Sequence, residues 1–335
     1  MKDLLKGKKI LVIGGTGTIG KALIKEMLIH DPFVIRVFSR DEYKQFIMEK
    51  EFKQHPKMRF LVGDVRDKDR IKKAMEGIDI VFNLAAMKHV PACEYNPFEA
   101  VKTNIIGTQN VIEAAIEENV KKVVYTSSDK SISPTNTMGA TKLLAEKLMQ
   151  TANYYKGLRS TAFSCVRFGN VMGSRGSVIP LVKKQIDDNT DITITNRDMT
   201  RFIMSIDNAV SLILEALNIT IGGEVFVLKM PVVKIGDLIE ILAEEYCIEK
   251  NLRFENVKFK EIGLRSGEKM YEELMTYEES KNAFETENMY VILPEDIEQN
   301  KYSKKVETKN YHSDSEFIMT KQEVRNFLNK NNLLK

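Results

Sequence analysis

Short apolar runs alternate with longer amphipathic stretches along the first 130 residues of the chain. An apolar run of about four to eight residues is typical of a buried strand, whereas apolar positions three and four apart indicate a helix. The pattern predicts strands at Ile10–Ile13, Val34–Phe38, Arg59–Val62, Ile80–Leu84 and Lys122–Thr126. Between them it predicts helices, including Gly20–Ile29, Asp67–Met75 with Asp67 as a candidate cap, and Asn104–Glu118. This alternation implies right-handed βαβ units and therefore an α/β fold with a doubly wound parallel sheet.

The pattern becomes less regular in the second half of the chain. It predicts two further strands, Ala162–Phe168 and Glu224–Leu228, and two helices, Ile235–Glu245 and Glu268–Met275. The last 35 residues are polar but contain Tyr302, Tyr311, Phe317 and Phe327. Because disordered segments are poor in aromatic residues, we expect a docked tail.

Composition narrows the class of protein without indicating its chemistry. The 335 residues are 43% hydrophobic and 29% charged, and 50 basic against 47 acidic residues leave a net charge of +3. So small an excess excludes nucleic-acid binding driven by bulk charge. Cys93, Cys165 and Cys247 lie far apart, which fits neither a disulfide framework nor a zinc site and favours a reducing cytoplasm. With no signal peptide and no apolar run of roughly 18–20 residues, we expect a cytoplasmic protein without a membrane span.

A glycine-rich loop follows the first predicted strand directly. Its glycines, in the stretch GGTGTIG, are spaced G-x-x-G-x-x-G and lead into an amphipathic helix. Such a loop allows a tight turn, a close backbone approach to a pyrophosphate and close helix packing, and the helix N-terminus favours anions. A tight structural turn is the alternative. We expect a Rossmann-type dinucleotide site that includes Gly14, Thr16, Gly17, Thr18, Ile19 and Gly20.

The end of the second strand bears on cofactor choice. An acidic residue there usually binds the ribose 2′-hydroxyl of NAD, whereas a neighbouring Arg accommodates the 2′-phosphate of NADP. Ser39 and Arg40, with Lys44 one helical turn further, favour NADP over NAD, and Asp41 is the counter-argument. Further along, we expect Asp64 and Val65 at the adenine and Ala85 and Ala86 at the nicotinamide ribose.

Polar residues cluster after the fifth strand, in Ser127-Ser128-Asp129-Lys130, and eight residues later comes Met138-Gly139-Ala140-Thr141-Lys142. These residues resemble the extended short-chain dehydrogenase/reductases, in which a strand-end Ser or Thr precedes Tyr-x-x-x-Lys. In that family the Tyr deprotonates a sugar hydroxyl, and the Lys lowers its pKa and binds the nicotinamide ribose. Ser128 and Lys142 match, but Met138 stands in the tyrosine position and has no titratable proton.

The Asp-Lys pair makes the resemblance more specific. The chain is similar to nucleotide-sugar 4,6-dehydratases acting on UDP-N-acetylglucosamine, some of which carry Met for Tyr. Matching stretches cover the whole chain and include FSRDEYKQ, NLAAMKHVPACEYNP, SPTNTMGATK, RFGNVMGSRGSVIP, ITITNRDMTRFIMS and RSGEKMYEELM. The resemblance implies an NADP-dependent enzyme of surface-glycan or nonulosonic-acid biosynthesis. It also implies a homo-oligomer that pairs through helices at 97–118 and 138–150.

The implied reaction explains the catalytic residue types. Oxidation of C4 acidifies the C5 hydrogen, so a base must remove that proton while an acid helps the C6 hydroxyl to leave. Asp129 and Lys130 can supply both, although a surface ion pair is the alternative. Because a mutual ion pair shifts both pKa values the wrong way, we expect the two groups to be out of direct contact or to share one proton. Lys88 and Lys142 are cationic neighbours that would lower the lysine pKa. The base for the C4 hydroxyl stays open between Ser128, Asp129 and a water.

A diphosphate substrate needs cations away from the nicotinamide. Arg175 and Arg201 are candidates, because the guanidinium fork binds phosphate in a bidentate manner. By resemblance, Asn170, Arg265 and Glu268 contact the phosphates and nucleoside, and Lys88 and His89 lie near the sugar. For His89 a structural role is the alternative. No His, Cys and Asp residues cluster at metal-ligand spacing, so we expect no metal.

These observations divide the chain. We expect an NADP-binding domain over 1–170, completed by sheet elements from about 203–230, and a substrate-binding lobe with the docked tail over 171–202 and 231–335. Two other functions remain open. One is a nucleotide-sugar epimerase, which usually requires a tyrosine where this chain has Met138. The other is a non-catalytic NADP sensor, which would need none of the catalytic residues.

Overall fold

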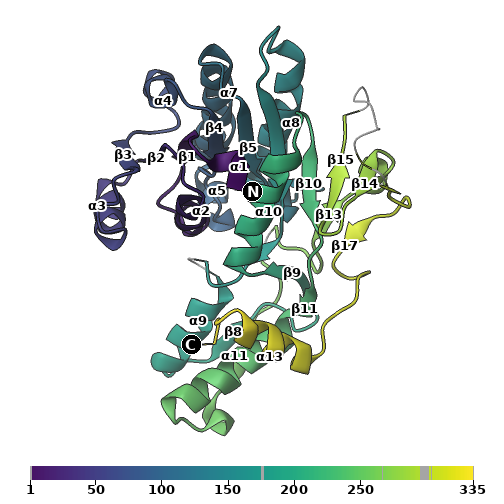
Figure 1. Cartoon of the computed structure of the whole chain (residues 1–335). Coiled ribbons are helices and arrows are strands. Elements are labelled where there is room, and N and C mark those ends of the chain that lie inside the picture. The colour runs from purple at the N-terminus through teal and green to yellow at the C-terminus, as the bar shows by residue number, and fades with distance from the viewer. Residues whose placement is uncertain (1, 175–176, 266, 295–301, 303, 335) are drawn as a thin grey trace.

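The computed structural model describes residues 2–174, 177–265, 267–294, 302 and 304–334. A large sheet with helices on both faces forms the upper part of the molecule in Figure 1, and a smaller lobe lies below it. The second half of the chain contributes to both parts, because it passes between them several times.

The central sheet is built mainly of parallel strands in the order β3-β2-β1-β4-β5-β6-β10. Their side chains are mostly buried, since helices cover both faces, and this explains the nearly continuous apolar runs. Every strand predicted from the pattern is present within one residue of its expected ends, and the predicted Rossmann-type α/β class is confirmed. The strands are β1 (Lys9–Ile13), β2 (Val34–Ser39), β3 (Met58–Val62), β4 (Ile80–Asn83), β5 (Lys122–Thr126), β6 (Ala162–Arg167) and β10 (Val225–Leu228).

The strand order reverses between β1 and β4. From β1 the chain moves outward to β2 and β3, then returns to β4 on the other side of β1. In such sheets ligands bind at the carboxyl ends of the strands beside this switch point. The fold therefore directs attention to the loops after β1, β4 and β5.

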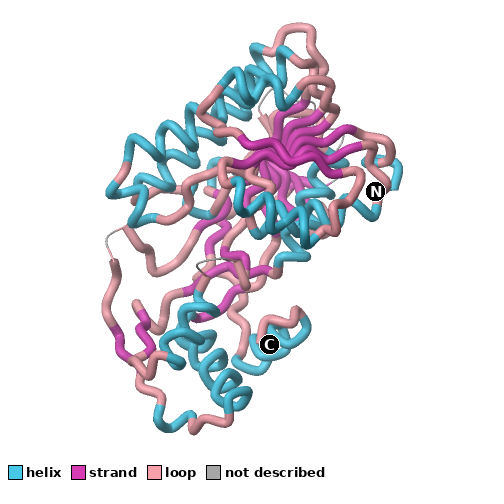
Figure 2. The backbone as a smooth tube through the Cα atoms, turned by 90° about the vertical axis from the view of Figure 1, so that its left-hand side faces the viewer, coloured by secondary structure: helices cyan, strands magenta, loops and turns pink. Residues whose placement is uncertain are grey.

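Helices pack on the two faces of this sheet, as Figure 2 shows. On one face α2 contacts α10, and on the other α7 contacts α4 and α8. Asp67 caps α4 by accepting a hydrogen bond from the Arg70 amide, as predicted. The helices are α1 (Lys2–Leu5), α2 (Thr18–Ile29), α3 (Glu42–Glu51), α4 (Lys68–Met75), α5 (Val90–Tyr95), α6 (Pro97–Ala100), the π-helix η1 (Val101–Ile106), α7 (Gly107–Glu117), the 3₁₀ turn η2 (Asp129–Ser131), α8 (Thr137–Tyr155) and α10 (Ile206–Ile219).

Three late strands extend the same sheet in the antiparallel sense. β15 (Met289–Ile292) pairs with β10, β14 (Ala283–Glu285) pairs with β15, and β16 (Lys304–Lys305) pairs with β14. The sequence pattern predicts this segment in the smaller lobe. The buried residues of β14 and β15 instead extend the large sheet at its edge.

The smaller lobe has its own apolar core, formed by residues such as Ile179, Val182, Leu238 and Leu328. It contains a three-stranded sheet in the order β11-β9-β7 and a parallel pair of β8 and β12. Its elements are β7 (Asn170–Val171), α9 (Val178–Asp187), β8 (Ile192–Ile194), β9 (Thr200–Met204), β11 (Val232–Lys234), α11 (Ile235–Lys250), the 3₁₀ turn η3 (Phe254–Asn256), β12 (Phe259–Glu261) and α13 (Lys321–Lys330). α13, in the tail, packs against α11.

The helix predicted over Glu268–Met275 is wrong. The segment is a loop followed by the short strand β13 (Glu273–Met275), which pairs with β17 (Tyr311–His312) and precedes α12 (Tyr277–Ser280). Its backbone is held by tertiary hydrogen bonds, including Glu272 N to Ser313 Oγ at 3.0 Å, and these override the helical spacing of its apolar residues. Among the helices that the structure describes, none is long and apolar enough to cross a membrane.

Candidate active site

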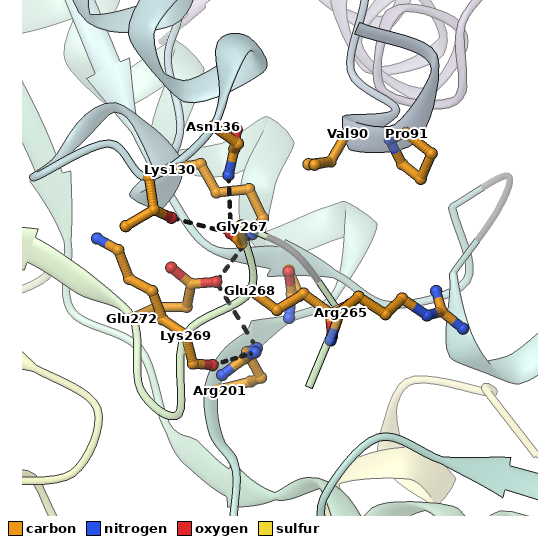
Figure 3. A pocket seen from close by; sticks show the side chains of 12 residues that line it. Val90, Pro91, Lys130, Asn136, Arg201, Arg265, Gly267, Glu268, Lys269 and Glu272 are labelled. Carbon is orange, nitrogen blue, oxygen red and sulfur yellow. Dashed lines mark hydrogen bonds and ion pairs between the residues drawn. The ribbon is translucent and has the colours of Figure 1, made fainter. Parts of the chain in front are cut away.

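Two neighbouring cavities open at the carboxyl ends of the central strands. The larger, of about 720 Å³, follows the loops after β1, β2, β4 and β5. The smaller, of about 220 Å³, lies between residues 130–136 and the loop before β13 (Figure 3). Lys130 and Asn170 line both cavities. A ligand in one cavity can therefore approach a ligand in the other at these two residues.

The glycine loop forms one wall of the larger cavity, and all six residues predicted there line it: Gly14, Thr16, Gly17, Thr18, Ile19 and Gly20. Gly14 has a φ of +77°, and a Cβ atom on it would lie 2.9 Å from the backbone nitrogen of Ala85. A Cβ atom on Gly20 would lie 2.7 Å from the Cα of Gly15. Larger residues would therefore displace the loop from β4 or from the start of α2, whose positive end faces this cavity.

The loop after β2 lines the far end of the larger cavity with Ser39, Arg40 and Lys44. The Arg40 side chain is 59% exposed and lies 3.8 Å from Asp64. The Asp41 carboxylate caps α3 by accepting from the Lys44 amide at 3.0 Å, and it pairs with the Lys44 ammonium. Asp41, the residue that argued for NAD, is thus engaged at the start of the helix.

Asp64 and Val65, predicted at the adenine, differ in their surroundings. Val65 lines the larger cavity, as do Ala85 and Ala86. The Asp64 carboxylate accepts hydrogen bonds from the Arg66 side chain at 2.7 and 3.0 Å. Burial raises the pKa of Asp64, but Arg66 outweighs this effect and the pKa is lowered overall. Asp64 is therefore an anion bound to Arg66, which makes it a poorer partner for an adenine amine.

Lys142 and Met138 lie one turn apart on α8 and both line the larger cavity. The Lys142 ammonium donates to Thr126 O at 2.5 Å and lies 4.2 Å from the centre of the Tyr125 ring. Burial lowers the pKa of Lys142 to about 8. Met138 is buried against Cys93 and Ala100. A thioether thus occupies the place beside the lysine where the resemblance implies a phenol.

Asp129 and Lys130 begin the 3₁₀ turn η2 directly after β5. Asp129 Oδ1 accepts a hydrogen bond from Ser128 Oγ at 2.6 Å, and the Lys130 ammonium lies 3.2 Å from Asp129 Oδ1 and 3.3 Å from Oδ2. Of the two alternatives expected for this pair, the one without direct contact is excluded by these distances. Burial lowers the pKa of Lys130, but the charges of Asp129 and Glu272 outweigh it, so the pKa is raised. The alternative of one shared proton stays open.

Glu272 is a site residue that the sequence analysis missed. Its Oε1 lies 3.2 Å from the Lys130 ammonium, and its side chain is 5% exposed. Burial and the charge of Asp129 raise its pKa. Its stretch, RSGEKMYEELM, predicts substrate contacts for Arg265 and Glu268, but a helix at this position gives no reason to expect a carboxylate beside Lys130.

Arg201, predicted to bind the diphosphate, lines the smaller cavity from β9. Its guanidinium donates to the backbone oxygens of Lys269 at 2.8 Å and Met270 at 3.2 Å, and its Nε lies 3.7 Å from Glu272. The side chain is buried and anchors the loop before β13. A phosphate would have to compete with these carbonyl groups for the same guanidinium.

The remaining substrate candidates are spread over the two cavities. Asn170, Arg265 and Glu268 line the smaller one, where Arg265 extends across the opening in Figure 3. Lys88 and His89 line the larger one, and His89 directly precedes α5. The structure thus brings together the residues predicted at the reacting sugar and those predicted at the nucleotide. Arg175 lies outside the described residues.

The loop before β13 closes over the catalytic turn through several hydrogen bonds. Thr135 Oγ1 and Asn136 Nδ2 both donate to Gly267 O, at 2.9 and 3.1 Å, and the Lys269 ammonium donates to Ile132 O at 3.0 Å. Gly267 has a φ of +79°, which favours glycine at this closest approach. The smaller cavity is therefore a gap between two segments that are distant in sequence and joined by polar contacts.

A protein-family model described as polysaccharide biosynthesis protein matches residues 10–294 of the chain. The chain belongs to the polysaccharide biosynthesis protein family. Its match to the extended short-chain dehydrogenase/reductases, implied above by Ser128, Lys142 and the glycine loop, is thereby confirmed. The X-ray structure of Pen from Bacillus thuringiensis is 52% identical, covers 99% of both chains and gives a TM-score of 0.94.

Curated relatives of this polysaccharide biosynthesis protein carry three different descriptions. An uncharacterized membrane protein of Methanocaldococcus jannaschii is 51% identical over 98% of this chain and 97% of its own. A UDP-N-acetylglucosamine 4,6-dehydratase (inverting) of Campylobacter jejuni is 45% identical over 86% and 83%. A UDP-glucose 4-epimerase of Rickettsia bellii is 43% identical over 85% and 82%. The protein is thus an enzyme of the nucleotide-sugar dehydratase and epimerase class.

More distant structures share the fold of this family member. DesIV, a dTDP-glucose 4,6-dehydratase from Streptomyces venezuelae solved with NAD and TYD bound, has a TM-score of 0.68 at 19% identity, covering 78% of this chain and 86% of its own. At this identity the likeness supports the fold class.

Proposed function

We propose that the protein is an NADP-dependent nucleotide-sugar 4,6-dehydratase that converts UDP-N-acetylglucosamine to its 4-keto-6-deoxy product, for surface-glycan or nonulosonic-acid biosynthesis. The observation that carries the proposal is the position of the Asp129–Lys130 pair: both residues line the larger cavity with Lys142 and Met138, and Lys130 also lines the smaller cavity. The 45% identity to the Campylobacter jejuni dehydratase supports it.

The roles of the chain's own residues follow from their positions. The glycine loop and Lys142 would hold NADP in the larger cavity, where the cofactor would supply reversible hydride transfer with the sugar. Lys142 holds the nicotinamide ribose, and its lowered pKa allows it to exchange a proton near neutral pH. Lys130 takes the C5 proton, and Asp129 assists the departing C6 hydroxyl. Ser128, which donates a hydrogen bond to Asp129, is the group we propose for deprotonation of the C4 hydroxyl.

NADP is the proposed form of the nicotinamide cofactor. Arg40 and Lys44 line the end of the larger cavity, and the Asp41 carboxylate is engaged as a helix cap. Two cations favour a 2′-phosphate, whereas NAD selection needs an available carboxylate. The NAD bound to DesIV supports a nicotinamide cofactor of either kind.

Two further properties are part of the proposal. We propose a homo-oligomer that pairs through residues 97–118 and 138–150, because Phe98 and Leu144 are exposed apolar residues on these helices. We also propose a cytoplasmic location, supported by three buried cysteines without disulfide partners in the described part of the chain.

The experiment that tests the function is incubation of the purified protein and NADP with UDP-N-acetylglucosamine, followed by mass spectrometry of the sugar nucleotide. Loss of one water supports the dehydratase. A product of unchanged mass but altered C4 configuration would support an epimerase. This is the second candidate function, because the Rickettsia bellii relative is described as a UDP-glucose 4-epimerase. No change with NADP bound would contradict both and leave the sensor.

A further inference from the structure

The catalytic lysine lies between two carboxylates rather than beside one. The Lys130 ammonium is 3.2 Å from Asp129 Oδ1 on one side and 3.2 Å from Glu272 Oε1 on the other. The two carboxylate side chains are 2% and 5% exposed, and Glu272 belongs to the wall of the smaller cavity. Figure 3 shows Glu272 and Lys130 on facing segments. The mechanism above uses Asp129 and leaves Glu272 without a role.

The backbone of Glu272 is fixed from the C-terminal tail. Glu272 N donates to Ser313 Oγ, Ser313 N donates to Glu272 O at 2.8 Å, and the Ser313 hydroxyl also donates to Thr200 O at 3.1 Å. Ser313 and Thr200 are both buried. On the next residue, Glu273 Oε2 accepts from Ser133 Oγ at 3.1 Å. β13 is therefore tied to the tail on one side and to the catalytic loop on the other, which holds the Glu272 carboxylate at the lysine.

The two carboxylates have different surroundings. Asp129 Oδ1 accepts hydrogen bonds from Ser128 Oγ and from the Lys130 amide at 2.8 Å. Glu272, within the described residues, has charged contacts to Lys130 and, at 3.7 Å, to Arg201. Burial and the neighbouring Asp129 charge raise the pKa of Glu272. Glu272 therefore accepts a proton more readily than an ordinary glutamate does.

Other charged groups surround this cluster. The elements packed against β13 contribute Asp129 and Lys130 from η2, Arg201 from β9 and His312 from β17, and its own segment contributes Arg265, Glu268, Lys269 and Glu273. His312 is opposite Glu273 in the strand pair and is hydrogen-bonded to Asp314. The Lys269 ammonium donates a hydrogen bond to Ile132 O. Within this described cluster, Asp129 and Glu272 are the two carboxylates that contact the Lys130 ammonium.

We propose that Glu272 is the positioning residue of Lys130: it holds the lysine at the junction of the two cavities and accepts one ammonium proton so that the lysine can act as the C5 base. This inference rests on the proposed function. In the step, one N–H bond of Lys130 breaks and an O–H bond forms on Glu272, leaving a neutral amine and a neutral acid. The amine then takes the C5 proton and becomes ammonium again. The cluster needs no proton exchange with bulk water before C5 deprotonation.

The pH profile of C5 proton exchange distinguishes this role from a structural one. In deuterated buffer with NADP and UDP-N-acetylglucosamine, we expect the wild-type rate of deuterium incorporation at C5 to be flat between about pH 7 and 9. In Glu272→Gln, Lys130 must lose its proton to bulk water, so we expect the rate to rise about tenfold per pH unit below the lysine pKa. Glu272→Asp should restore a flat profile at a lower rate.

Glu273→Gln is the matched control, because it removes a carboxylate from the adjacent residue without touching Lys130. We expect its profile to keep the wild-type shape whatever its rate. A flat profile in Glu272→Gln, or a sloping profile in the wild type, would overturn the inference.

A second measurement does not depend on the substrate. Competitive acetylation of Lys130 in the NADP-bound protein, followed by mass spectrometry across pH, reports the lysine titration. We expect the midpoint to fall by about one pH unit or more in Glu272→Gln, because a carboxylate is lost from the ammonium. An unchanged midpoint would contradict the proposed interaction between Glu272 and the Lys130 ammonium. If the wild type makes no keto product from UDP-N-acetylglucosamine, the proposed function fails, and this measurement still decides the Glu272–Lys130 relationship.

Discussion

Met138 and Lys142 face the same cavity from consecutive turns of α8, so that a thioether lies where the family resemblance implies a phenol. Met138 is buried against Cys93 and Ala100 and makes no polar contribution there.

We therefore expect Met138→Leu to keep C4 oxidation within a few-fold of the wild-type rate. The substitution nearly conserves volume and removes no titratable group, and such core changes usually cost less than about 1.5 kcal/mol. Single-turnover formation of reduced cofactor at 340 nm is the measurement. A loss of about a hundredfold with unchanged folding would mean that the sulfur takes part in the reaction.

The lowered pKa of Lys142 predicts how stability depends on pH. Its pKa is about 8 in the folded protein because of burial and 10.5 in the unfolded chain, so the unfolded state binds more protons between these values. Burial of the charged ammonium therefore destabilises the folded protein by a constant amount below about pH 8. This penalty, of up to roughly 3 kcal/mol, is progressively removed as the pH increases from about 8 to 10.5.

Lys142→Met should remove this pH dependence. The free energy of unfolding in urea, measured for both proteins from pH 7 to 10.5, gives the difference directly. We expect the wild type to gain stability relative to the variant across the upper part of that range. A difference that stays constant with pH would show that the Lys142 ammonium is not destabilised by burial.

The cofactor proposal predicts a change in preference rather than a loss of binding. In Arg40→Ala, we expect the affinity for NADP to fall roughly ten- to a hundredfold while that for NAD changes little, since one charge-assisted contact is worth about 1.5–3 kcal/mol. Fluorescence titration with each reduced cofactor measures both affinities. Arg66→Ala is the control, because Arg66 pairs with Asp64 and Glu99 and does not line the larger cavity. Equal ratios in wild type and Arg40→Ala would refute the NADP assignment.

The parts of the fold that could be predicted are those in which local pattern and tertiary structure agree. β1 is an apolar run in the sequence because helices cover both faces of the sheet. Gly14 is recognisable because its backbone has a positive φ and passes close to the backbone of Ala85, which only a glycine permits. Glu272 was out of reach for the opposite reason. Its position depends on Ser313, 41 residues away, and on Lys130. Neither contact affects the spacing of apolar and polar residues around Glu272, so that spacing could not predict them.

A buried charge cluster behind the active site provides a stability prediction. Arg167 is fully buried, pairs with Glu146, and contacts Glu279 Oε1 at 2.9 Å, which joins β6 and α8 to α12. Replacing the arginine by methionine leaves two carboxylates without their cation. We expect Arg167→Met to lower the free energy of unfolding by about 3–5 kcal/mol, because removing one partner of a buried ion pair leaves the other charge buried and uncompensated.

Thermal or urea unfolding of Arg167→Met measures this cost. Lys72→Met is the matched comparison, because Lys72 forms a surface ion pair with Glu117 whose side chains are 48% and 40% exposed. Exposed pairs contribute about 0–1 kcal/mol, so its unfolding should hardly change. Similar losses in the two variants would contradict the role of burial.

The proposed pairing surface can be tested by introducing charge at its centre. Leu144 is 51% exposed on α8, in the segment proposed to pair with a second copy. If it becomes buried in an oligomer, an aspartate there would place a carboxylate in an apolar interface, and we expect Leu144→Asp to dissociate the assembly. Phe46→Asp changes a similarly exposed residue on α3, away from that surface, and should leave the assembly intact. Light scattering after size exclusion gives the mass of each protein, and an unchanged mass for Leu144→Asp would place the pairing surface elsewhere.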